Sequence, residues 1–152
     1  MEKEILISEI NEAFKDVELD GGIGIGEANA LDDHRDEKFR AECKKNDEKH
    51  RWSTIPSSIL NQYYCSLSYF DAKGMKFHLP AFMIAVIKDE YRFDIDFTLT
   101  NISDDYSKSR FALFTKKQRE AVKLFLEYIL KIRDLGFEET DIRTAIKNYW
   151  SL

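Results

Sequence analysis

The sequence predicts a mainly α-helical protein: a single compact domain of about five to six helices over residues 1–152. The length of 152 residues suits one domain, and the 43% of hydrophobic residues can build one sizeable core. Apolar residues recur at helical spacing along most of the chain. Only the segment near residues 93–100 alternates in the manner of a strand, so we expect at most one short β element.

The N-terminal third is expected to hold two helices joined by a glycine-rich connection. Residues 2–16 place Ile5 and Ile10 on one helical face and acidic residues on the other. Residues 19–26 contain four of the six glycines. A phosphate or dinucleotide site would need a strand before these glycines or a P-loop lysine after them, so the segment is interpreted as a flexible connection. Residues 27–50 mix acids with bases and are expected to form one solvated helix.

The most hydrophobic stretch, residues 67–87, is expected to form the centre of the fold. Residues 71–74 are interpreted as a turn or a helix end. Pro80 suits the first turn of a buried helix that runs to about Glu90. A short helix over residues 57–64 is expected to precede this stretch, because its apolar residues recur at helical spacing.

Residues 91–102 are interpreted as extended or irregular. Phe93, Ile95, Phe97 and Leu99 alternate with polar residues, which is typical of a half-buried strand. No second strand lies within easy reach in the sequence, so a β element here would be short.

Two helices are expected to close the chain. Thr115 and Gln118 form a capping-box pattern, in which each side chain bonds a backbone N–H of the other residue. An apolar stripe follows at helical spacing, and the last helix is expected to begin near Thr140.

Charge and cysteine content exclude several classes of protein. The net charge is −5, and no basic cluster offers the phosphate contacts of a nucleic-acid-binding protein. We see no signal peptide and no membrane-spanning run, so we expect a cytoplasmic protein. Cys43 and Cys65 are expected to be free thiols, because no CxxC spacing indicates a zinc or redox site. No cofactor is expected.

Several segments together resemble an uncharacterised bacterial family, a domain of unknown function. The most specific is Phe77–Phe82, which is similar to an aromatic-aromatic-Leu-Pro-Ala-aromatic box, with His78 where the family usually has an aromatic residue such as tyrosine. The resemblance implies a small cytosolic bacterial helical protein and supplies no activity and no catalytic residues. The other segments, in order, are Ile23–Asp33, Trp52–Pro56, Leu67–Phe70, Phe111–Gln118 and Phe125–Tyr128.

An acidic stretch bordered by aromatic residues is the first candidate site. Residues 94–105 contain four aspartates and no basic residue. Acidic surfaces accelerate and select encounters with basic partners, and aromatic residues are enriched at the centres of interfaces. The alternative is an ordinary solvated loop. The candidate partner-binding residues are Asp94, Asp96, Asp104, Asp105, Tyr91, Phe93 and Tyr106.

A metal or acid–base site is the alternative location of function. Asp32, Asp33 and His34 are consecutive, and together with the distant His78 they could bind a metal ion or support acid–base chemistry. Adjacent residues on a helix point in different directions, so at most two of the three could join one site. Otherwise Asp32 caps or precedes the charged helix, and His78 is buried and hydrogen-bonded to backbone.

These features favour a small acidic cytosolic protein-binding module. In its most concrete form it is an immunity or antitoxin-type protein that binds and neutralises a toxin domain with a basic surface. The first alternative is a metal- or ligand-dependent enzyme that uses Asp32, Asp33, His34 and His78. The second is a structural, homo-oligomeric module. The sequence leaves the oligomeric state open.

Overall fold

The mainly α-helical prediction is confirmed by the computed structural model, which describes residues 1–152 and contains no strand. Nine α-helices are present instead of five or six, because expected long segments are divided into shorter helices. No helix combines the length and the apolar character that a membrane crossing needs. The helices are α1 (Lys3–Phe14), α2 (Ile25–Asp32), α3 (Glu37–Asn46), α4 (Ser57–Gln62), α5 (Ala72–Ile87), α6 (Asp96–Thr100), α7 (Asp105–Ser109), α8 (Lys116–Ile132) and α9 (Glu138–Ala145).

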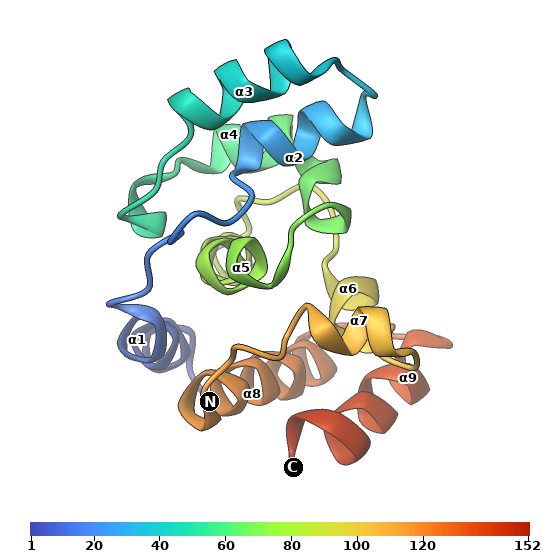
Figure 1. Cartoon of the computed structure of the whole chain (residues 1–152). Helices are drawn as coiled ribbons and strands as arrows, with labels where there is room; N and C mark the ends of the chain where they lie inside the picture. The colour runs from blue at the N-terminus through green and yellow to red at the C-terminus, as the bar shows by residue number, and fades with distance from the viewer.

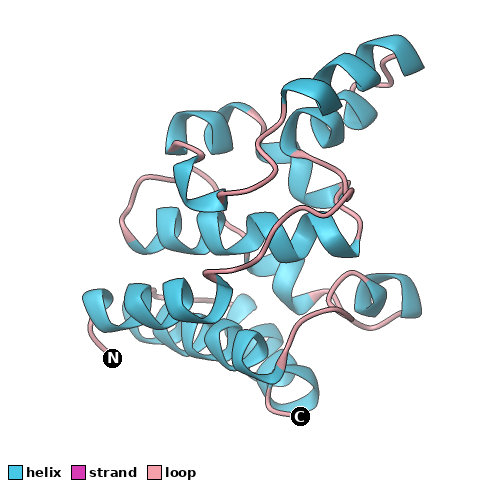
Figure 2. Ribbon diagram, turned by 60° about the vertical axis from the view of Figure 1, so that its left-hand side comes forward, coloured by secondary structure: helices cyan, strands magenta, loops and turns pink.

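The helices lie on two sides of α5, which runs through the middle of the molecule (Figure 1). In this view α2, α3 and α4 lie above α5, and α1, α8 and α9 lie below it. Figure 2 shows only helices and the loops between them. Short 3₁₀ segments, Trp52–Thr54 and Tyr64–Ser68, flank α4, and a π-helical turn, Ile146–Trp150, follows α9. One cluster of buried apolar side chains extends from Leu6 to Trp150 and so draws on both ends of the chain.

The central helix α5 begins earlier than expected. The Asp71 side chain accepts a hydrogen bond from the Gly74 N–H (2.8 Å) and caps the helix about two turns before Pro80. Pro80 therefore lies inside α5, and the expectations of a turn at residues 71–74 and of a proline-started helix are wrong. Because proline has no N–H, the Lys76 carbonyl lacks its helical donor. Close packing compensates for this loss, since eleven of the fourteen residues from Gly74 to Ile87 are buried.

Two aspartates hold the glycine-rich connection. The Asp71 carboxylate accepts a hydrogen bond from the Ile23 N–H (3.0 Å), and the Asp47 carboxylate accepts one from the Gly26 N–H (2.8 Å) at the start of α2. A Cβ atom on Gly24 or Gly26 would collide with the Asp47 side chain. The glycines are thus needed for close packing, and a carboxylate of the chain itself occupies the helix end that a phosphate would use.

The expected solvated helix over residues 27–50 is two helices. The chain turns after α2, where His34 adopts a left-handed backbone conformation with φ 54°. Asp36 then caps α3 by accepting a hydrogen bond from the Phe39 N–H (2.8 Å). None of the α3 side chains is buried, which agrees with the solvated character expected of this segment.

Residues 91–102 form no strand, so the expected β element is wrong. Ile95 and Leu99 are buried one helical turn apart, whereas Phe97, which a strand would place on the same face, is 75% exposed. Asp96 is 7% exposed, although alternation would have placed it in solvent. Helical spacing explains this burial pattern, because side chains at i and i+4 share a face of a helix.

The N-terminal helix α1 packs on α5 and α8. Ile10 and Phe14 are fully buried, as expected of the apolar face, but Ile5 is 51% exposed. The prediction that Ile5 belongs to the buried face of α1 is therefore wrong. The end of α1 is held from far along the chain, since Gln118 Nε2 donates to the Ala13 carbonyl (3.1 Å).

The C-terminal helices follow the expected pattern. The Thr115 hydroxyl accepts from the Gln118 N–H (3.2 Å), and the Gln118 side chain accepts from the Thr115 N–H (2.9 Å), so the capping box is confirmed. The indole N–H of Trp150, which is buried, donates to the Leu99 carbonyl (2.9 Å) and joins the chain end to α6.

Candidate functional site

Two aspartates of the acidic stretch are held by one arginine. Arg133, at the end of α8, lies 3.0 Å from an Asp94 oxygen and 2.7 Å from an Asp96 oxygen. Burial raises the pKa of Asp96, and the Arg133 charge opposes this rise. Asp96 is therefore an internal residue, whereas the Asp94 side chain remains 71% exposed and can still face a partner.

The other two aspartates begin α7. Asp104 accepts a hydrogen bond from the Ser107 N–H (2.7 Å), and this bond lowers the pKa of its carboxyl. Asp105 is exposed in the first turn of the helix. The ring of Tyr106, next to it, is 67% exposed. Asp104 thus has a structural role as the cap of α7, and Asp105 and Tyr106, the first two residues of the helix, are exposed.

Three aromatic rings form a cluster near the acidic stretch. Phe93 lies face to face with Tyr64, with ring centroids 4.2 Å apart and planes 20° apart. Tyr91 meets the edge of Phe93 at 5.7 Å and is only 8% exposed. Burial raises the pKa of Tyr91 to about 12, so this residue supports the site from below as a neutral phenol. Tyr64 is not among the residues predicted for this site, because its helical spacing with Leu60 is also typical of a core residue.

The Asp32 carboxylate joins the same surface from α2. Its charge is the main cause of the raised pKa of Tyr69, to which Tyr106 also contributes. It also adds to the effect of burial in raising the pKa of the Cys65 thiol, beside Tyr64. Cys65 and, less strongly, the Asp32 charge raise the pKa of Tyr64, so residues of both candidate sites are near enough to influence one another. We call this surface the aromatic face and define it by the rings of Tyr64, Phe93 and Tyr106 and the carboxylates of Asp32 and Asp94.

The residues of the metal-site alternative are dispersed. Asp33 and His34 are exposed in the turn after α2, whereas His78 is completely buried in α5. His78 Nδ1 lies 2.7 Å from the Gly74 carbonyl, and its ring stacks on Phe70 at 4.2 Å. Burial lowers the pKa of His78 to about 4. No three His, Cys, Asp or Glu side chains are placed to hold one metal ion.

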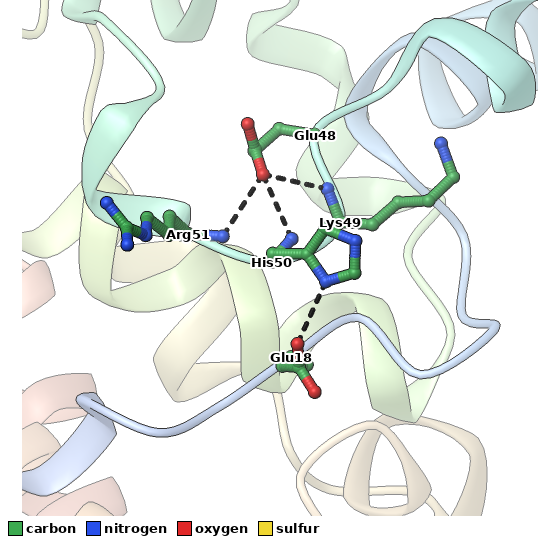
Figure 3. Close-up of polar contacts among 5 residues, drawn as sticks. All are labelled: Glu18, Glu48, Lys49, His50 and Arg51. Carbon is green, nitrogen blue, oxygen red and sulfur yellow. Dashed lines mark hydrogen bonds and ion pairs between the residues drawn. The ribbon is translucent and has the colours of Figure 1, made fainter.

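A polar cluster beside the glycine-rich connection has a structural role. The Glu48 carboxylate accepts hydrogen bonds from the three backbone N–H groups that follow it, at 3.0 to 3.2 Å (Figure 3). These bonds lower the pKa of Glu48 and fix the turn. His50 Nδ1 lies 2.8 Å from Glu18, and both side chains are exposed. The His50–Glu18 pair thus bridges two loops.

The thiols of Cys43 and Cys65 are both unpaired, as expected. Burial raises the pKa of each thiol, and nearby carboxylates raise it further. A nucleophilic cysteine needs a lowered pKa, so both side chains lie in surroundings that disfavour the reactive thiolate.

Comparison with known proteins gives a family and no described activity. No curated protein matches the sequence. No solved structure matches it either. A family of unknown function (DUF6714) matches residues 1–152, and the expected membership of an uncharacterised family is confirmed. Because this match covers the full length of the sequence, the chain belongs to the DUF6714 family.

Proposed function

We propose that the chain is a protein-binding module and that the aromatic face is its docking surface. The observation that carries the proposal is the stacked pair of Tyr64 and Phe93, which remain 49% and 41% exposed. Buried Tyr91 supports the pair, so the rings are held in place before binding. Rigid exposed aromatic rings are the side chains that contribute most to protein interfaces, because they add contact area at little entropic cost.

The charge of the aromatic face favours a basic partner. Asp32 and Asp94 belong to it, and exposed Asp33 and Asp105 lie next to its members in the sequence. Carboxylates beside an apolar centre steer a basic protein to the surface and fix its orientation. In its most concrete form the chain is an immunity or antitoxin-type protein that covers a basic toxin domain and neutralises it.

Co-expression with the products of neighbouring reading frames tests this proposal. We expect a salt-sensitive complex that suppresses toxicity of the neighbour. Tyr64→Ala and Phe93→Ala are each expected to weaken it at least about tenfold, as truncation of a central aromatic residue does. Phe137→Ala is the matched control, because this ring is 95% exposed and outside the aromatic face.

Two results would oppose the proposal. One is a complex that Phe137→Ala weakens as strongly as Tyr64→Ala does. The other is the lack of any complex together with unchanged toxicity of the neighbouring product. If sedimentation instead shows a dimer of the chain that Tyr64→Ala dissociates, the aromatic face serves a homo-oligomer and the toxin-binding role is wrong.

A further inference from the structure

A second surface, separate from the aromatic face, contains an open cavity of about 540 Å³ between α3 and the chain segment around α4. We call it the α3–α4 groove. Phe39 and Cys43, one turn apart on α3, form one apolar wall. Ile55 and Ile59 form part of the opposite wall, and Ile25 of α2 also lines the groove.

The α3 wall is only partly covered within the protein. No side chain of α3 is buried, and of the other helices it packs mainly on α2. The Phe39 ring is 39% exposed, and its one close cationic neighbour, Arg35, stacks on it at 3.6 Å. Most surface helices bury an apolar stripe against the core. In α3 the residues that could form such a stripe, Phe39 and Cys43, are four positions apart and both line the groove. Their apolar surface is therefore left for another molecule.

The groove is acidic as well as apolar. Its lining contains Glu42, Asp47 and Glu48 and no lysine, arginine or histidine. Burial raises the pKa of the Cys43 thiol in the wall, the charges of Asp47 and Glu42 raise it further, and the charge of Arg35 opposes them. A cationic group near the groove would therefore be stabilised, and an anionic one repelled.

We propose that the α3–α4 groove binds an amphipathic helical segment of another protein, with an apolar face and flanking Lys or Arg residues. A volume of about 540 Å³ can take several side chains of such a helix. An apolar groove with α3 as one wall matches the helix-in-groove mode of recognition. The charge selects a basic segment over an acidic one. This inference goes beyond the proposed function and does not rest on the aromatic face.

Two matched helical peptides test the groove directly. Both carry the same leucine and phenylalanine face, one with flanking lysines and the other with flanking glutamates. In methyl NMR titrations we expect the lysine peptide to shift the signals of Ile25, Ile55 and Ile59. Ile102 and Ile142, which do not line the groove, should not respond. The glutamate peptide is expected to bind at least about tenfold more weakly.

Two variants locate the binding site. Phe39→Ala removes half of the α3 wall and is expected to lower the affinity for the lysine peptide at least about tenfold. It should leave the fold intact, because no side chain of α3 is buried. Phe97→Ala, a change of the same size at an exposed ring outside the groove, should leave the affinity unchanged. Glu42→Lys tests the charge and should reduce the preference for the lysine peptide.

Several outcomes would overturn this inference. It fails if the lysine peptide leaves the groove methyl signals unmoved, or if both peptides bind equally. It fails equally if Phe39→Ala has the same affinity as the wild-type protein. Methyl shifts of Ile25 and Ile59 that depend on protein concentration alone would assign the groove to a second copy of the chain. Loss of binding in Tyr64→Ala, with Phe39→Ala unaffected, would place the peptide on the aromatic face instead.

Discussion

Buried His78 should make the stability of the protein fall steeply in mild acid. Its pKa is lowered from 6.5 to about 4 by burial in α5. Protonation would also place an N–H on Nε2, which is buried and has no hydrogen-bond partner. Since the unfolded chain takes up this proton first, the stabilisation by neutral His78 is complete above about pH 6.5 and is lost as the pH falls toward about 4.

The magnitude follows from the two pKa values. Each pKa unit is worth about 1.4 kcal/mol, so the full difference for His78 is about 3 kcal/mol. Integrating the two titrations between about pH 7 and about pH 4.5 gives a loss of about 2 kcal/mol from this residue alone. Urea unfolding at both pH values measures it, with fluorescence from buried Trp52 and Trp150 as the signal.

His78→Phe isolates this contribution, because the other titratable groups stay in place and the ring can still stack on Phe70. Between the same two pH values the free energy of unfolding of the variant should fall by about 2 kcal/mol less than that of the wild-type protein. His34→Gln, at an exposed histidine, should keep the wild-type pH dependence. Equal pH dependence of His78→Phe and the wild-type protein would refute the reasoning.

Three further predictions concern the free energy of unfolding, measured by the same assay. Thr115→Ala removes one half of the capping box and is expected to cost about 1 kcal/mol. Gly24→Ala drives a methyl group into the Asp47 carboxylate and is expected to cost about 1–3 kcal/mol. Arg133→Ala leaves Asp96 buried and unpaired, at a cost of about 2 kcal/mol near neutral pH, and less in acid, where Asp96 takes up a proton.

Each of these predictions has a matched control. Thr115→Ser keeps the capping hydroxyl and should retain the wild-type stability within a few tenths of a kcal/mol. Gly136→Ala should cost much less than the change at Gly24, since the nearest atom to its Cβ is a Glu138 oxygen at 3.8 Å. Asp96→Asn should recover much of the loss in Arg133→Ala. If the double variant is as unstable as Arg133→Ala alone, Arg133 stabilises the protein through packing and not through charge.

The helical class was predictable because its signals are local. The capping box at Thr115 and Gln118 requires only residues of one turn, and it is present as expected. The burial of the 67–87 stretch follows from its composition. Pro80 was misplaced because its rule concerns helix starts, whereas tertiary packing around α5 tolerates a proline in the interior. The 91–102 segment was misread because alternation over eight residues fits a strand as well as a short helix with one buried carboxylate.

The candidate site was predictable in part. Phe93 and Tyr106 were identified from the sequence and lie on the aromatic face. The stacking of Phe93 on Tyr64 could not be foreseen, since it joins positions that are far apart in the chain. The same holds for the ion pair of Asp96 with Arg133, which lies 37 positions further along the chain. Residue types at a surface can be recognised locally, but their partners depend on the fold.

The bond between Gln118 and the end of α1 has a consequence for how the chain acquires its structure. The two residues it joins, Gln118 and Ala13, are 105 positions apart. During synthesis α1 emerges well before α8, which packs on it. We therefore expect α1 to gain hydrogen-exchange protection at the same late stage as α8, because contacts of high sequence separation form slowly. Protection of α1 in nascent chains that lack α8 would contradict this order.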